Sequence, residues 1–158
     1  MGTVPKNDWT SIFDIAKPNA SYSLEDYILF EELYIEAITG FIDFLQLRRV
    51  QVQRLEKRDK KLRIHHFPQL YSREMVELYS SVQEYQLVDK ESAGSLSRLA
   101  LRENLWFKLI AGDKLFVHFG YDYYMYIGSD LACSAVINKI INSGLFAEPW
   151  ISPYHPEE

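Results

Sequence analysis

Hydrophobic side chains between residues 24 and 45 recur at steps of three and four positions, which is the spacing of one face of an α-helix. A second apolar stripe, made of isoleucines, runs beside the first, so this helix is predicted to pack deeply against a sheet. Ser23, followed three positions later by Asp26, is a typical helix-start signal. Gly40 interrupts the pattern and is expected to end or kink the helix.

From residue 49 to residue 54 the pattern changes to strict alternation of polar residues with valine. This period of two, with Val50 and Val52 on one face, predicts a β-strand, and β-branched side chains favour strands. The competing interpretation continues the helix through Val52 and Leu55. A polar turn follows, and residues 62 to 66 are expected to form a short return strand or a loop.

Four further helices are predicted from residue types that favour helix ends. Ser72 and Asp89 can each cap a helix start, and apolar residues at helical spacing follow both of them. Asp8 can cap a short helix near the N-terminus. A last helix is predicted over residues 131 to 142, where a Ser-Gly pair ends it.

The stretch from Leu105 to Ile127 contains three short apolar or aromatic runs separated by turns centred on Gly112 and Gly120. This arrangement predicts a three-stranded antiparallel meander. The predicted strands span residues 105–110, 114–119 and 122–127.

These elements together predict one α+β domain over residues 1–158, in which residues 1–8 are expected to be disordered. The sheet is expected to be mostly antiparallel, with four or five strands, and helices before and after the meander are expected to cover one face. A last strand is predicted over residues 145 to 151. Because Pro149 lacks a backbone donor, that strand is expected at an edge of the sheet.

The net charge of −5 hides a strongly basic segment. Residues 48 to 66 carry eight lysines and arginines against two acids, a net +6, so the rest of the chain carries −11. Aromatic residues do not interleave with these basic side chains, so a solvated turn is favoured over an anion or nucleic-acid patch. The acidic remainder disfavours nonspecific nucleic-acid binding and favours a basic partner.

The single cysteine, Cys133, lies in an apolar run at helical spacing, so we expect a buried structural thiol and a reducing compartment. No secretory signal is visible, and no apolar stretch reaches the roughly 20 residues that a membrane-spanning helix needs. The sequence therefore predicts a cytoplasmic protein that does not contact a membrane.

The sequence contains no nucleophile motif, phosphate loop or metal-ligand spacing. His65 and His66 are adjacent, so in an extended chain they point in opposite directions and cannot bind one metal ion together. Arg102 and Glu103 are expected to form a buried ion pair, with a catalytic pair as the alternative. No metal or cofactor is predicted.

Alternation within the meander places Asp122, Tyr124 and Tyr126 on one face of its third strand, with His118 nearby on the neighbouring strand. This cross-strand patch could bind a ligand or a protein. In the competing interpretation the tyrosine hydroxyls reach the rim of the sheet and His118 is a structural histidine. A second candidate contact face is the acidic part of the long helix, with Glu25, Asp26, Glu31 and Glu32.

The C-terminal half resembles small bacterial immunity proteins in three stretches: RLALREN (98–104), VHFGYDYYMYIGS (117–129) and GLFAEPWISPY (144–154). The likeness lies in an acidic, aromatic-rich chain without catalytic motifs. It implies a cytoplasmic α+β domain that neutralises a cognate toxin by binding it.

The predicted function is therefore that of a non-enzymatic protein-binding module whose partner is a bacterial toxin domain. The alternative is a small enzyme, or a nucleotide- or RNA-binding domain, that uses His118, Asp122 and Tyr124.

Overall fold

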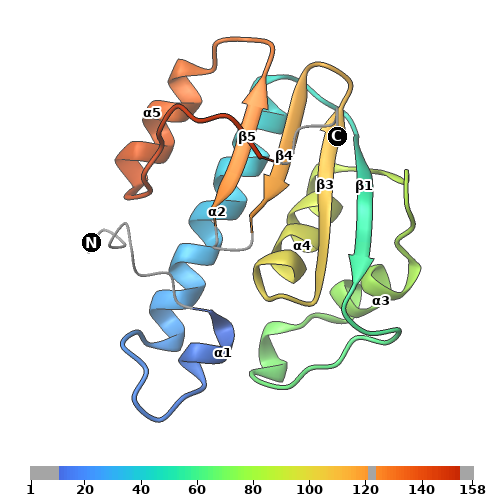
Figure 1. The fold of residues 1–158 in the computed structure, drawn as a ribbon, viewed down its shortest axis with the longest axis vertical. Helices are drawn as coiled ribbons and strands as arrows, with labels where there is room; N and C mark the ends of the chain where they lie inside the picture. The colour runs from blue at the N-terminus through green and yellow to red at the C-terminus, as the bar shows by residue number, and fades with distance from the viewer. Residues whose placement is uncertain (1–10, 121–123, 154–158) are drawn as a thin grey trace.

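A five-stranded antiparallel sheet with strand order β2-β1-β3-β4-β5 forms the centre of the fold (Figure 1). The computed structural model describes residues 11–120 and 124–153. The strands are β1 (Val50–Lys57), β2 (Leu87–Val88), β3 (Leu105–Ala111), β4 (Leu115–Phe119) and β5 (Met125–Ser129). The helices are α1 (Ile12–Ile15), α2 (Leu24–Phe44), α3 (Arg73–Ser81), α4 (Lys90–Leu101) and α5 (Ser134–Ser143), with a 3₁₀ turn, η1, at Pro68–Leu70.

The predicted α+β class and the meander are confirmed, because β3, β4 and β5 follow one another and pair as neighbours. The valine alternation also forms a strand, β1, so the helical alternative for this segment is wrong. The short strand β2 was not predicted, since two residues are too few to show a period. Residues 62 to 66 form a loop.

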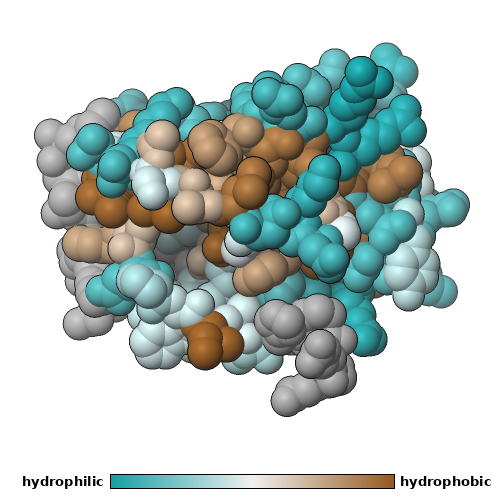
Figure 2. Space-filling view, turned by 90° about the horizontal axis from the view of Figure 1, so that it is seen from above, coloured by the Kyte–Doolittle hydropathy of each residue, from teal (hydrophilic) through white to brown (hydrophobic). Residues whose placement is uncertain are grey.

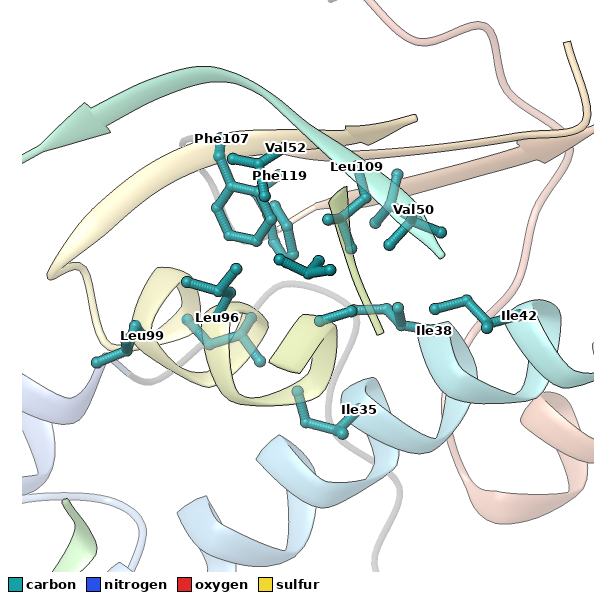
Figure 3. Packing of buried hydrophobic residues seen from close by; sticks show 14 of the residues in the cluster. Ile35, Ile38, Ile42, Val50, Val52, Leu96, Leu99, Phe107, Leu109 and Phe119 are labelled. Carbon is teal, nitrogen blue, oxygen red and sulfur yellow. The ribbon is translucent and has the colours of Figure 1, made fainter. Parts of the chain in front are cut away.

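The hydrophobic core lies between the inner face of the sheet and the helices α2 and α4, which stand behind the sheet in Figure 1. Figure 3 shows how side chains of the sheet meet side chains of the helices in this core. Val52 and Leu109 point from the sheet, and Ile38 and Leu96 point toward them from the helices. All four side chains have zero exposure. The stripe of α2 that carries Ile38 is therefore the stripe that the sequence predicted to pack on a sheet.

Helix starts follow the predicted capping residues where the structure describes them. The side-chain oxygens of Ser23, Ser72 and Asp89 accept hydrogen bonds from the first-turn amides of α2, α3 and α4. In α1 this role belongs to Ser11, and the predicted cap Asp8 lies outside the described residues.

Gly40 neither ends nor interrupts α2, which continues to Phe44, so the expected break is wrong. Instead, Gly40 lies against α5: a Cβ atom built on it would lie 3.5 Å from a methyl carbon of Val136. The helix α5 begins at Ser134, three residues later than predicted. It ends as expected at Gly144, whose φ of 110° favours glycine.

A β-bulge in β1 protects the part of this strand that β2 does not cover. The register shifts between Gln53 and Glu56, and Arg54 adopts a positive φ of 55°. The carboxylate of Glu84 accepts hydrogen bonds from the backbone amides of Arg54 and Leu55, at 2.8 and 2.7 Å. These amides would otherwise be open to strand pairing with another chain.

The last strand predicted over residues 145 to 151 is wrong, because these residues form no strand. Figure 1 shows this C-terminal segment leaving α5 and crossing β5 toward β4 on the side of the sheet away from α2. Pro149 and Pro153 cannot donate backbone hydrogen bonds, so a regular ladder is disfavoured. A side-chain contact of Ser152, described below, holds the segment in place.

Candidate functional site

Two residues of the predicted cross-strand patch, His118 and Tyr126, lie together on the outer face of the sheet. His118 of β4 and Tyr126 of β5 are direct Cα partners, so their side chains share one face. His118 is fully buried, and its ring stacks on Phe116 at a centroid distance of 4.6 Å. The C-terminal segment contributes to this burial, because Ser152 Oγ lies 2.7 Å from His118 Nδ1. His118 is therefore enclosed and not available at the surface.

Tyr124 lies just before β5. Unlike the buried His118, it is 56% exposed. The amide of Gly120 donates a 2.6 Å hydrogen bond to its carbonyl oxygen, which closes the β4–β5 hairpin. Asp122 lies outside the described residues. Of the four predicted patch residues, the structure thus brings His118 and Tyr126 together and leaves Tyr124 exposed.

The acidic residues of α2 do not form one surface. Glu25 and Asp26 are exposed in the first turn, where Asp26 also accepts hydrogen bonds from Ser23. These hydrogen bonds hold the pKa of the Asp26 carboxyl below its usual value. Glu32 is half-buried and pairs with Arg98 at 2.8 Å.

Glu31 cannot belong to a contact face, because its residue exposure is only 2%. Its carboxylate accepts hydrogen bonds from Nε and Nη2 of Arg102 at 2.8 and 2.6 Å. A sequence signal for this burial exists: Glu31 stands four positions from both Tyr27 and Ile35, which lie on the buried stripe of α2. The spacing alone did not indicate burial, because a carboxylate is seldom buried unless it is paired. The partner of Glu31, Arg102, lies 71 positions away in the sequence.

The predicted pair between Arg102 and Glu103 is likewise wrong, since Arg102 bonds Glu31 instead. Glu103 adopts a positive φ of 60° and accepts a 2.6 Å hydrogen bond from the hydroxyl of Ser11. Tyr27 is buried beside the ion pair, and burial together with the nearby Glu31 charge raises the pKa of its phenol. These contacts connect α1, α2 and the end of α4, so they serve to hold the fold together.

A pocket of about 400 Å³ lies where the ends of β1, β3, β4, β5 and α4 meet. Trp106, Phe119, Tyr124 and Met125 give it an aromatic and apolar wall. Charged residues at the end of β1 and residues around the end of α4 also line it. Tyr124 is one of the predicted site residues, but no pattern in the sequence indicates that these five chain segments converge.

Large apolar side chains are exposed on α5 and on the segments beside it. We call the following six the C-terminal apolar residues: Leu131, Ile137, Ile141, Phe146, Trp150 and Ile151. Trp150 and Ile151 are 77% and 85% exposed, and α5 has no buried residue. Figure 2 shows hydrophobic side chains reaching the surface between hydrophilic ones in the view from above. A strand over residues 145 to 151 would have buried some of these side chains, so their exposure was not expected from the sequence.

Within residues 11–120 and 124–153, no three His, Cys, Asp or Glu side chains gather as a metal site would require. No helix in the same ranges is both long enough and apolar enough to cross a membrane. Comparisons of the chain with protein-family models, curated proteins and solved structures find no match.

Proposed function

We propose that this chain is a non-enzymatic protein-binding module of the immunity type, which neutralises a bacterial toxin domain by binding it. The observation that carries the proposal is the exposure of the C-terminal apolar residues, above all Trp150 and Ile151. Tryptophan is enriched among the residues that contribute most to protein–protein binding, and large exposed apolar patches are typical of interaction sites.

Charge supports a basic partner. The chain has a net charge of −5, and Glu25, Asp26 and Glu36 are exposed on α2. Acidic side chains of this kind speed the approach of a basic protein without dominating the final affinity. Glu31 has no part in this role because Arg102 neutralises it in the interior.

The alternative function, an enzyme or nucleotide- or RNA-binding domain using His118, Asp122 and Tyr124, has weaker support. Tyr124 borders the pocket, whereas His118 is not among the described residues that line it. His118 is instead buried against Phe116 and Ser152. These two side chains therefore do not converge on one space where a substrate could sit.

The test is co-purification with the toxin domain encoded by the neighbouring gene, followed by binding kinetics on the purified pair. Replacing Trp150 by Ala is expected to weaken binding by about tenfold or more, mainly through faster dissociation. Replacing Glu25 and Asp26 by Gln and Asn is expected to slow association and reduce its salt dependence.

Tyr85→Ala is the matched control, because Tyr85 is 65% exposed but lies in the loop before β2. This variant is expected to bind like the unmodified chain. The absence of a toxin gene beside this one, together with the absence of a stable partner in the pull-down, would overturn the proposal. Equal losses in the Trp150 and Tyr85 variants would show that the binding surface lies elsewhere.

A further inference from the structure

We propose that residues 58–66, the basic loop between β1 and η1, bind single-stranded nucleic acid. Basic side chains of the loop bind the phosphates, and flat groups beside them stack on the bases. This inference does not rest on the toxin-binding proposal, because the loop contains none of the C-terminal apolar residues and none of the exposed acids of α2.

The basic loop presents positive charge to solvent. It contains four basic residues and a single acid, a net +3 with histidines neutral: Arg58, Lys60, Lys61 and Arg63 against Asp59. Within the part of the chain that the structure describes, no carboxylate lies within ion-pair distance of Lys60 or Lys61, and both residues are exposed. Arg63 lies 3.5 Å from Asp59, yet its side chain is 69% exposed. These ammonium and guanidinium groups can bind phosphate oxygens.

The start of the basic loop is fixed to the fold. The hydroxyl of the buried Tyr79 donates a 2.6 Å hydrogen bond to the carbonyl oxygen of Asp59. The backbone amide of Arg58 donates a 3.0 Å hydrogen bond to the carbonyl oxygen of Asn104. The lysines that follow therefore stand on a backbone that is already held, so less ordering is needed when a strand binds.

The structure also places an aromatic ring from another element against the basic loop. The sequence disfavoured nucleic-acid binding because no aromatic residues interleave with the basic ones. Phe13 of α1 supplies a ring: its centre lies 5.2 Å from Cζ of Arg58 and 6.0 Å from the ring centre of His66, which it meets edge to face. Arg58 and His66 are both exposed. Guanidinium planes and histidine rings are surfaces on which unpaired bases stack.

These features favour a single strand over a duplex. Stacking on the protein requires bases that are not already stacked within a double helix. Residues 58–66 form neither a helix nor a strand that could enter a groove and read base edges. Since the chain as a whole carries −5, its overall charge does not attract nucleic acid, and binding depends on direct contact with this loop.

The experiment measures binding of the full chain to fluorescently labelled oligouridine by anisotropy at several salt concentrations. Binding is expected to be saturable, and the logarithm of its association constant is expected to fall with the logarithm of the salt concentration with a slope of about −2. Three phosphate contacts, by Lys60, Lys61 and Arg63, contribute about −0.7 each. A duplex of the same length and a polyglutamate peptide are expected to bind more weakly. Equal or tighter binding of either would overturn the proposal, and for polyglutamate it would indicate an acidic protein as the partner.

Two sets of variants separate charge from stacking. Lys60→Gln/Lys61→Gln is expected to reduce the steepness of the salt dependence by about 1.4. His66→Ala is expected to weaken binding about tenfold without changing the slope, whereas His66→Phe keeps a ring and is expected to retain the affinity. The matched controls are Lys114→Gln, in the turn between β3 and β4, and His65→Ala, and both are expected to bind like the unmodified chain.

All of these positions are exposed, so the variants are expected to fold, which circular dichroism checks. Absence of saturable oligouridine binding would overturn the proposal. An unchanged salt slope in the double lysine variant, or equal losses in the His66→Ala and His65→Ala variants, would do the same.

Discussion

Glu31 on α2 and Arg102 at the end of α4 form a two-point ion pair in the interior, with side-chain exposures of 1% and 4%. The guanidinium also donates a 2.6 Å hydrogen bond to the carbonyl oxygen of Leu70 and lies 4.9 Å from the centre of the Tyr71 ring. One arginine thus connects two core helices to the turn η1. A buried arginine at such a junction is satisfied only while all these partners are present.

Replacing Glu31 by Gln is expected to destabilise the protein strongly, by about 3–5 kcal/mol, because the buried Arg102 charge loses its counter-charge. Urea denaturation followed by circular dichroism measures this change. The double variant Glu31→Leu/Arg102→Met is expected to be more stable than either single variant, since it leaves no buried charge uncompensated. Exposed ion pairs contribute at most about 1 kcal/mol. A Glu31→Gln variant whose free energy of unfolding lies within about 1 kcal/mol of that of the unmodified chain would therefore contradict this view.

The control for this series is Glu32→Gln, at the neighbouring position. Glu32 bonds Arg98 at 2.8 Å, but its side chain is 46% exposed. Exposed ion pairs contribute between about 0 and 1 kcal/mol, so this change is expected to have a small effect. Arg98 also lies 3.2 Å from Glu31, so it keeps one carboxylate partner in this control, and the contrast compares the loss of a buried carboxylate with the loss of a half-exposed one.

Gly128 on β5 leaves room for the ring of Phe116 on the neighbouring strand β4. A Cβ atom built on Gly128 would lie 2.1 Å from a ring carbon of Phe116, its Cα partner on β4. Gly128→Ala is therefore expected to displace the ring and to cost about 1–3 kcal/mol. The double variant Gly128→Ala/Phe116→Ala is expected to show less than the sum of the two single losses, measured by thermal or urea unfolding.

Gly40→Ala is the matched control for this prediction, because the nearest atom to its added methyl group lies at an ordinary 3.5 Å. Alanine in a helix interior is more favourable than glycine by roughly 0.5–1 kcal/mol. The control is thus expected to leave stability unchanged or to raise it. Comparable destabilisation in both variants would point to a general intolerance of β-carbons and not to the Phe116 contact.

Ser152 fastens the C-terminal segment to the sheet through His118, at 2.7 Å. Ser152→Ala removes this hydrogen bond and is expected to cost about 0.5–1.5 kcal/mol. Hydrogen exchange is expected to accelerate in residues 145 to 153 while the core strands keep their protection. Ser80→Ala, at an exposed position of α3, is the control, and exchange that is uniformly faster throughout the chain would contradict a local role.

The parts of the fold that sequence could predict are those that depend on neighbours in the chain. Alternation identified β1 and the meander, and Ser23, Ser72 and Asp89 marked helix starts, because both signals act over a few residues. The shared face of His118 and Tyr126 followed from strand alternation and the hairpin turn.

What sequence could not predict depends on contacts between distant segments. Glu31 looks like the other acids of α2 until Arg102, 71 positions later in the chain, is placed against it. In the same way, the burial of His118 depends on where Ser152 comes to lie, 34 positions away. The pocket requires the ends of five elements to meet, and no short pattern in the sequence records that meeting.

Asp89 gives the stability of the protein a defined dependence on acid. The hydrogen bond from the Ser92 backbone amide, 2.8 Å from the Asp89 carboxylate, holds the pKa of this carboxyl below its usual value. Its stabilising effect is therefore fully present above the unfolded pKa. The effect is lost as the pH falls through the lower folded pKa, when the carboxyl becomes protonated in the native state.

Asp89→Ala is expected to cost about 1 kcal/mol at neutral pH, because α4 loses its N-terminal cap. Asp89→Asn keeps a capping oxygen and is expected to cost less at neutral pH, while it flattens the acid limb of the stability curve. Urea denaturation at neutral pH and at successive acidic values measures both effects. The loss caused by Asp89→Ala is expected to shrink as the native carboxyl protonates, and a loss that stays constant across the acid range would show that its charge contributes nothing to the cap.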